Sequence, residues 1–260
     1  MERFALAREL VLQAGAALRE SRLREDEIQH KSGYQDLVTR WDKETEQFLR
    51  RGISEAFPQD IIVGEEYPAA NEGAEGCTWY LDPIDGTTNF IRRYRPSAIS
   101  AGLVKDGEGM LGLVYDPWAD ELFSAVRGQG AFCNGNPIHA AEIPLENALF
   151  VFGTAPYHRE LAEASFAVAK EVFLHCGDLR RCGSAALDLC YIAAGRCDGF
   201  FEAVLSPWDY AGASVILQEA GAHIGTVPGR AFTYQEPQPI LAGTDALFRL
   251  LQEAAGKHLA

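Results

Sequence analysis

The sequence lacks long apolar runs, a secretory leader and closely paired cysteines. It has no uninterrupted apolar stretch of roughly 18 residues, so no segment is predicted to cross a membrane. The start, from Met1 to Phe4, opens an amphipathic pattern rather than the apolar core of a signal peptide. None of the six cysteines forms a C-x-x-C pair, which disfavours a zinc site. We therefore expect a cytoplasmic protein with reduced thiols.

Basic residues are scarce relative to acidic ones. The 260 residues include 37 acidic and 23 basic side chains, which gives a formal net charge of −14. This charge repels nucleic acid and anionic lipid, so neither is expected as the main partner. If some of the acids are metal ligands, the bound cations reverse the local field, so an acidic chain of this kind can still bind an anion.

The chain shows no repeats and no flexible linker rich in serine or proline. Apolar residues at helical spacing predict a helix over 4–18, and a second helix is predicted from a cap at Asp42 to Pro58. Short apolar runs predict strands in the first half. These lie at 61–63, 78–81, 121–126 and 131–133, with a hairpin over 98–115 that turns at 105–107.

The second half alternates between strands and helices. Its predicted strands lie at 149–152, 179–181, 199–203, 223–227 and 239–242, and its predicted helices at 158–173, 184–194, 209–220 and from 245 onward. Strands followed by such an alternation predict an α+β half joined to an α/β half. We place the halves at residues 1–140 and 141–260.

The most specific chemical signal is the string DPIDGTTNF at residues 82–90, which ends an apolar strand. Pro83 fixes the backbone angle φ and Gly86 permits a close approach, so the chain can turn and aim both Asp carboxylates at one point. A short helix starting at Thr87 would bring free N–H groups to that point, which suits a phosphate. Hard oxygen ligands beside an anion suit Mg²⁺. The simpler alternative is a turn whose Asp side chains cap backbone groups.

Two further groups of acids end predicted elements. Glu65 and Glu66 follow the strand at 61–63, and Asp209 follows Ser206-Pro207-Trp208 at a helix start. Asp209 taken alone is better explained as a helix N-cap. Because three acidic strand or helix ends occur together, a metal site is favoured over three unrelated caps.

At this point the sequence resembles the inositol monophosphatase family of Mg²⁺-dependent, lithium-sensitive phosphatases. The resemblance rests on three motifs that occur in the family's order. They are Gly64-Glu65-Glu66, the string at 82–90, and Trp208-Asp209-Tyr210-Ala211-Gly212-Ala213. Weaker agreement comes from Lys31-Ser32, Asp36 to Thr39, Asp42 and Gly183-Ser184-Ala185. It implies a layered αβαβα sugar-phosphatase fold and a homodimer.

The resemblance also implies a role for each motif residue. The metal ligands would be Glu65, Asp82, Asp85, Asp209 and the carbonyl of Ile84, holding two or three Mg²⁺ ions. The catalytic residues would be Thr87, Asp42 and Glu65, with Thr87 and Asp42 orienting the attacking water. The substrate-binding residues would be Gly86, Thr87, Gly183, Ser184, Ala185 and Glu202. The expected activity is hydrolysis of inositol monophosphate or a related small sugar phosphate by metal-activated water.

Several alternatives stay open. Fructose 1,6-bisphosphate, NADP and histidinol phosphate are alternative substrates, because pocket loops differ on one shared fold. Arg92, Arg93 and Arg95, beside the predicted mouth, would offer partners for the second phosphate of a bisphosphate, but solvated surface side chains are the simpler explanation. A metal- or partner-binding regulator with dispensable catalysis is the alternative from another class. Cys190 and Arg196 match the spacing of cysteine phosphatases, but the apolar surroundings of Cys190 predict a core position.

Overall fold

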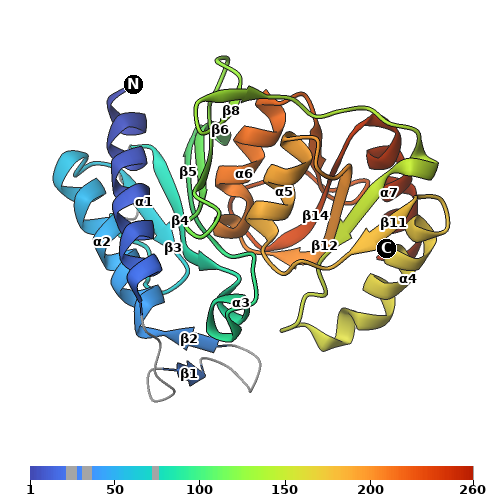
Figure 1. The fold of residues 1–260 in the computed structure, drawn as a ribbon, viewed down its shortest axis with the longest axis horizontal. Coiled ribbons are helices and arrows are strands. Elements are labelled where there is room, and N and C mark those ends of the chain that lie inside the picture. Colours follow the sequence, from blue (N-terminus) through green and yellow to red (C-terminus); the bar gives the residue numbers. More distant parts are fainter. Residues whose placement is uncertain (22–27, 31–36, 72–75, 260) are drawn as a thin grey trace.

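The computed structural model describes residues 1–21, 28–30, 37–71 and 76–259. Lys31, which the motif comparison singled out, lies outside them, as do Ser32 and Asp36. The described chain forms five layers in the order helices, sheet, helices, sheet, helices (Figure 1). The expected αβαβα fold is confirmed. No helix in this part of the chain is both long and apolar enough to cross a membrane.

The first outer layer consists of α1 (Glu2–Glu20) and α2 (Arg40–Ala56). Both helices pack against one face of the first sheet in a shared apolar cluster. The N-cap of α2 is Thr39 and not Asp42, which occupies the third helical position. The two side chains form a capping box, which satisfies two backbone N–H groups at once.

The first sheet has seven strands in chain order, parallel at β3–β4 and antiparallel elsewhere. They are β3 (Ile61–Gly64), β4 (Thr78–Asp85), β5 (Ala98–Lys105), β6 (Glu108–Asp116), β7 (Glu121–Val126), β8 (Ala131–Cys133) and β9 (Asn136–Ile138). The predicted hairpin is β5–β6, and its turn residues Asp106 and Gly107 both have positive φ. The sequence analysis missed β9 and a small ribbon of β1 (Ile28–His30) and β2 (Leu37–Thr39).

The second sheet has the order β11–β10–β12–β14–β13, and its outer face carries α4 and α7. Its elements are β10 (Leu149–Phe152), α4 (Ala162–Phe173), β11 (Asp178–Arg180), β12 (Gly199–Leu205), β13 (His223–Gly225), β14 (Gln238–Gly243) and α7 (Asp245–His258). The helix predicted from 158 begins at Ala162, after a 3₁₀ turn at Arg159–Leu161. The strands change sheet between β9 and β10, and the division at residue 140 into halves stays a prediction.

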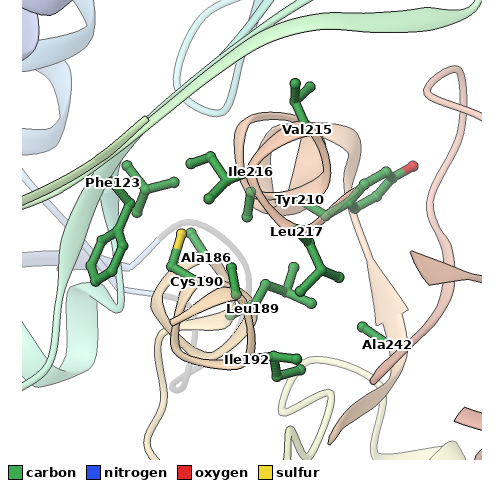
Figure 2. Packing of buried hydrophobic residues seen from close by; sticks show 14 of the residues in the cluster. Phe123, Ala186, Leu189, Cys190, Ile192, Tyr210, Val215, Ile216, Leu217 and Ala242 are labelled. Carbon is green, nitrogen blue, oxygen red and sulfur yellow. The ribbon is translucent and has the colours of Figure 1, made fainter. Parts of the chain in front are cut away.

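The middle layer consists of α5 (Ala185–Ala193) and α6 (Pro207–Glu219), which are apolar on nearly all sides. Figure 2 shows Phe123 of β7 on one side of these helices and Ala242 of β14 on the other. Cys190 lies in this core and is fully buried, so its predicted core position is confirmed. The two helices therefore join both sheets, and the first turn of α5 lies beside the end of β4, as the hydrogen bonds of Asp85 below show.

Candidate active site

The string at 82–90 forms the end of β4, a turn and the short helix α3 (Thr87–Arg92). The strand was predicted to stop near Asp82, but it continues to Asp85 through a register shift against β5. The shift accommodates Pro83, which has no N–H to give to the sheet. Gly86 then has φ +90°, and a Cβ there would lie 2.9 Å from the Gly183 carbonyl oxygen. Glycine is therefore required both by the turn and by the close approach.

Asp42 and Thr87, which are 45 residues apart, meet at the start of α3. The Thr87 hydroxyl is 3.1 Å from Oδ1 of Asp42 and 3.1 Å from the carbonyl oxygen of Ile84. The other carboxylate oxygen of Asp42 accepts hydrogen bonds from the backbone N–H and hydroxyl of Thr39. Burial, partly offset by these hydrogen bonds, raises the pKa of Asp42 to about 6. The capping box thus fixes the carboxylate that contacts Thr87.

Asp85 joins β4 to the first turn of α5. Its Oδ2 accepts hydrogen bonds from the Ser184 hydroxyl at 2.5 Å and from the Ala186 N–H at 2.8 Å. Ser184 occupies the N-cap position of α5, but its hydroxyl bonds to Asp85 instead of capping the helix. Burial raises the pKa of Asp85 to about 6. Asp82, whose Oδ1 accepts the Ile84 N–H, is also buried.

Asp209 and Glu202 come from α6 and β12. Taken alone, Asp209 was better explained as an N-cap, but Ser206 has that position and Asp209 accepts its N–H at 2.7 Å, while its expected role as a metal ligand stays a prediction. Glu202 is only 8% exposed, so it is not a solvated residue on the face of its strand. Its Oε1 accepts the Ala155 N–H at 2.8 Å, and burial raises its pKa to about 7.

Most of these side chains line two adjoining cavities. The first, of about 130 Å³, is lined by most of the predicted site residues: Glu65, Asp82, Ile84, Asp85, Gly86, Thr87, Gly183, Ser184, Ala185 and Glu202. The second, of about 270 Å³, is lined by Asp209 and shares Glu65 and Glu202 with the first. Asp42 reaches the site through its hydrogen bond with Thr87. A larger cavity of about 600 Å³ lies between α1 and β7–β8, but Asp120 is the one acid in its lining, so we base the site on chemistry rather than on volume.

Sequence reasoning missed Glu46 and Arg181. Glu46 is buried on α2, where it pairs with Arg50 and accepts the backbone N–H of Glu66 at 2.7 Å. It thereby holds the turn that carries Glu65. The one sequence feature that could have indicated a paired Glu46 is the basic Arg50 four residues later. Arg181 lines the first cavity and directly precedes Cys182 and the predicted Gly183 motif, a proximity that could have identified it.

The predicted arginine group lies partly elsewhere. Arg93 and Arg95 line a separate cavity of about 240 Å³ together with Arg19. Arg92, Arg93 and Arg95 are all exposed, as expected of solvated side chains, and a role toward a second phosphate stays a prediction. Arg93 and Arg95 follow α3 at its C-terminal end, whereas the acids lie at its N-terminal end, so the short helix separates the two groups.

The oxygen-rich lining fits a hard cation by its chemistry. Burial first, and then the charge of Glu65, raises the pKa of Asp82 well above its usual value, and a cation would relieve both effects. Within the described residues, no group of three or more His, Cys, Asp and Glu side chains is arranged so that it could hold a metal ion. Mg²⁺ typically binds one or two carboxylates, with water and substrate phosphate completing its shell, so it does not require such a closed group.

Comparison with known proteins identifies the class of enzyme. A crystal structure of the extragenic suppressor protein suhB from Bartonella henselae superimposes with a TM-score of 0.91 and 30% identity, covering 99% of each chain. The inositol-1-monophosphatase of Bacillus subtilis strain 168 is 38% identical over 95% of this chain and 94% of its own length. The fructose-1,6-bisphosphatase/inositol-1-monophosphatase of Aquifex aeolicus strain VF5 is 35% identical over 98% and 95%. The chain is thus a phosphatase.

The family follows from the whole chain. The sequence model of the inositol monophosphatase family matches residues 1–260, so the protein belongs to that family. The family is generally metal-dependent.

Proposed function

We propose that this protein is a Mg²⁺-dependent phosphomonoesterase that hydrolyses inositol monophosphate or a related small sugar phosphate. The observation that carries the proposal is the gathering of two buried carboxylates of β4 with half-buried carboxylates from α6 and the turn after β3, in the cavities beside the start of α3. Two or three Mg²⁺ ions, inhibition by Li⁺, a homodimer and a cytoplasmic location belong to the same proposal. They rest on the family resemblance.

Bound Mg²⁺ would lower the pKa of the attacking water and stabilise the leaving oxygen. Glu65, Asp82, Asp85, Asp209 and the Ile84 carbonyl would hold it. Because the Thr87 hydroxyl can donate to Asp42, its lone pairs are free to accept a hydrogen bond from the attacking water. Thr87 and Asp42 would thus orient that water.

The substrate would extend from the start of α3 toward β12. The first amides of α3, beginning at Gly86 and Thr87, would bind the phosphate. Gly183, Ser184 and Ala185 would line the pocket beside the organic half. Glu202 already accepts one backbone N–H through Oε1 and would use its remaining lone pairs to accept substrate hydroxyls.

A sugar bisphosphate is a second candidate substrate, and Arg181 favours it. Arg181 is the only arginine or lysine among the described residues that line the two cavities. It offers an anion partner for a second phosphate. The Aquifex relative named above carries both activities in its name.

Phosphate release from inositol 1-phosphate tests the proposal. Activity is expected with Mg²⁺ and not with EDTA. Asp85→Asn should lower kcat by about 10²-fold or more, the scale for losing an electrostatic group in a metal site. Asp116→Asn is the matched control, because Asp116 is a buried acid outside both cavities that accepts the N–H groups of Trp118 and Ala119. Full activity in EDTA, or equal activity of the two folded variants, would refute the proposal.

A further inference from the structure

The loop between β10 and α4 forms a wall that both site cavities share. Pro156 and Tyr157 of this loop line both cavities, together with Leu205 at the end of β12. The proposed function assigns the polar groups of the site to phosphate and hydroxyls. It gives no role to this largely apolar wall.

Tyr157 is the large side chain of the wall, and 52% of it is exposed. Aromatic side chains stabilise a fold mainly by burying their rings, so folding gains little from a tyrosine exposed to this extent. A binding pocket, in contrast, commonly combines an aromatic surface with a few placed polar groups. Glu202 lines the same two cavities and is a candidate for such a group.

The loop is held in place by Glu202 itself. Oε1 of Glu202 accepts the N–H of Ala155, whose φ of +41° is strained for a residue with a side chain. A Cβ at position 153 would collide with the Glu202 carboxylate, so Gly153 allows the loop to lie directly against it. Glu202 therefore fixes the backbone two residues before Tyr157, in the wall that both side chains share.

We propose that Tyr157 is a specificity-determining residue whose ring packs against the carbon face of a cyclic polyol phosphate. A six-membered polyol ring presents C–H groups on its faces and hydroxyls along its edge. It therefore matches an aromatic wall beside a carboxylate that accepts hydroxyls. An acyclic polyol phosphate has hydroxyls but no such face. The inference rests on the proposed function and names its substrate class as ring-shaped polyol phosphates.

The test compares a cyclic and an acyclic substrate, inositol 1-phosphate and glycerol 2-phosphate, with the full-length protein and Mg²⁺. Tyr157→Ala should lower kcat/KM for inositol 1-phosphate about tenfold, mainly by raising KM. A tenfold change is the scale for losing one well-packed aromatic contact. Its rate on glycerol 2-phosphate should not change. Tyr157→Phe should behave as wild type on both substrates, because the ring face and not the hydroxyl makes the contact.

The control is Tyr94→Ala, which removes a similarly exposed tyrosine that lines a different cavity. It should leave both rates unchanged, and thermal melts should show that all variants keep the fold. Equal losses of Tyr157→Ala on both substrates, no loss on either, or a Phe variant as poor as the Ala variant would each overturn the inference alone. If the wild-type protein hydrolyses neither substrate, the proposed function fails and the inference falls with it.

Discussion

Replacing Glu202 by glutamine should make the protein more stable and less able to use polyol phosphates. Burial raises the pKa of Glu202 from its usual 4.5 to about 7. Each pKa unit corresponds to about 1.4 kcal/mol, so ionising this side chain in the folded protein costs about 3 kcal/mol. Glutamine has nearly the same shape, carries no charge, and can accept the Ala155 N–H through its amide oxygen.

The sign of the effect depends on pH. Below about 4.5 the carboxyl is protonated in both the folded and the unfolded state, so it adds no cost. Between about 4.5 and 7 the folded protein keeps the proton that the unfolded chain loses, and stability falls as pH rises. Above about 7 the full cost is present. Glu202→Gln should therefore gain most stability at pH 8 and little at pH 5.

Thermal melts of the metal-free protein measure this difference. At about 2–4 °C per kcal/mol for a chain of this size, the variant should melt roughly 6–12 °C higher at pH 8. Asp198→Asn is the control, a buried acid outside both cavities that accepts the Leu149 N–H. An equal difference between wild type and Glu202→Gln at pH 5 and pH 8 would refute the assignment of the cost to an ionised Glu202.

The same variant should lose selectivity. Its kcat/KM for inositol 1-phosphate should fall by a factor that corresponds to roughly 1–3 kcal/mol of lost transition-state stabilisation. This is the scale for a hydrogen bond to a charged acceptor. Turnover of p-nitrophenyl phosphate, which has no hydroxyl groups for Glu202 to bind, should be spared. Asp198→Asn should leave the ratio of the two rates unchanged. If Glu202→Gln lowers both rates equally, or neither, Glu202 does not bind the polyol.

Three further predictions concern the cation site. Asp209→Asn should lower turnover of inositol 1-phosphate and p-nitrophenyl phosphate alike, and a loss confined to one substrate would argue against a shared metal role. Mg²⁺ should raise the melting temperature more at pH 8 than at pH 5.5. The pKa values of Asp42 and Asp85 are about 6, so at the lower pH both side chains carry protons that oppose binding of the cation. Equal shifts of the melting temperature at both pH values would contradict this. Ca²⁺ should not replace Mg²⁺ in a phosphate-release assay, because it takes more ligands at longer distances, and by family resemblance millimolar Li⁺ should inhibit. Equal turnover with Ca²⁺, or indifference to Li⁺, would count against the inositol phosphatase assignment.

The local parts of the site could be predicted from the sequence. Pro83 and Gly86 constrain the backbone within a few residues, so the turn after β4 and the start of α3 followed from the string itself. The strand–helix alternation of the second half was predictable for the same reason, because hydrophobic periodicity is a short-range signal. The ends of elements were placed less well: pairing with β5 carries β4 past Asp82 to Asp85, and the helix predicted from 158 begins at Ala162.

The long-range parts could not be predicted from short-range patterns. Strand periodicity alone gave no sign that Glu202 is covered, because Gly153 and Ala155, which lie against it, are almost fifty residues earlier in the chain; the family resemblance alone singled it out. Glu46 had no visible role because its partner, the turn at Glu66, lies twenty residues away. Neither the periodicity of β12 nor that of α2 contains this information. The placement of Asp42 and Asp209 at the third position of their helices likewise depended on which neighbour became the N-cap.

The energetics of the site explain why a net charge of −14 is compatible with binding a phosphate. Burial raises the pKa values of Asp82, Asp85 and Asp209, so the protein alone is destabilised by keeping these acids ionised. Such a cluster is retained for what it binds rather than for folding. A cation offsets the repulsion among the acids and at the same time attracts the phosphate. The acidic site and the anionic substrate are therefore coupled through the metal, and the protein should hold its substrate only when the cation is present.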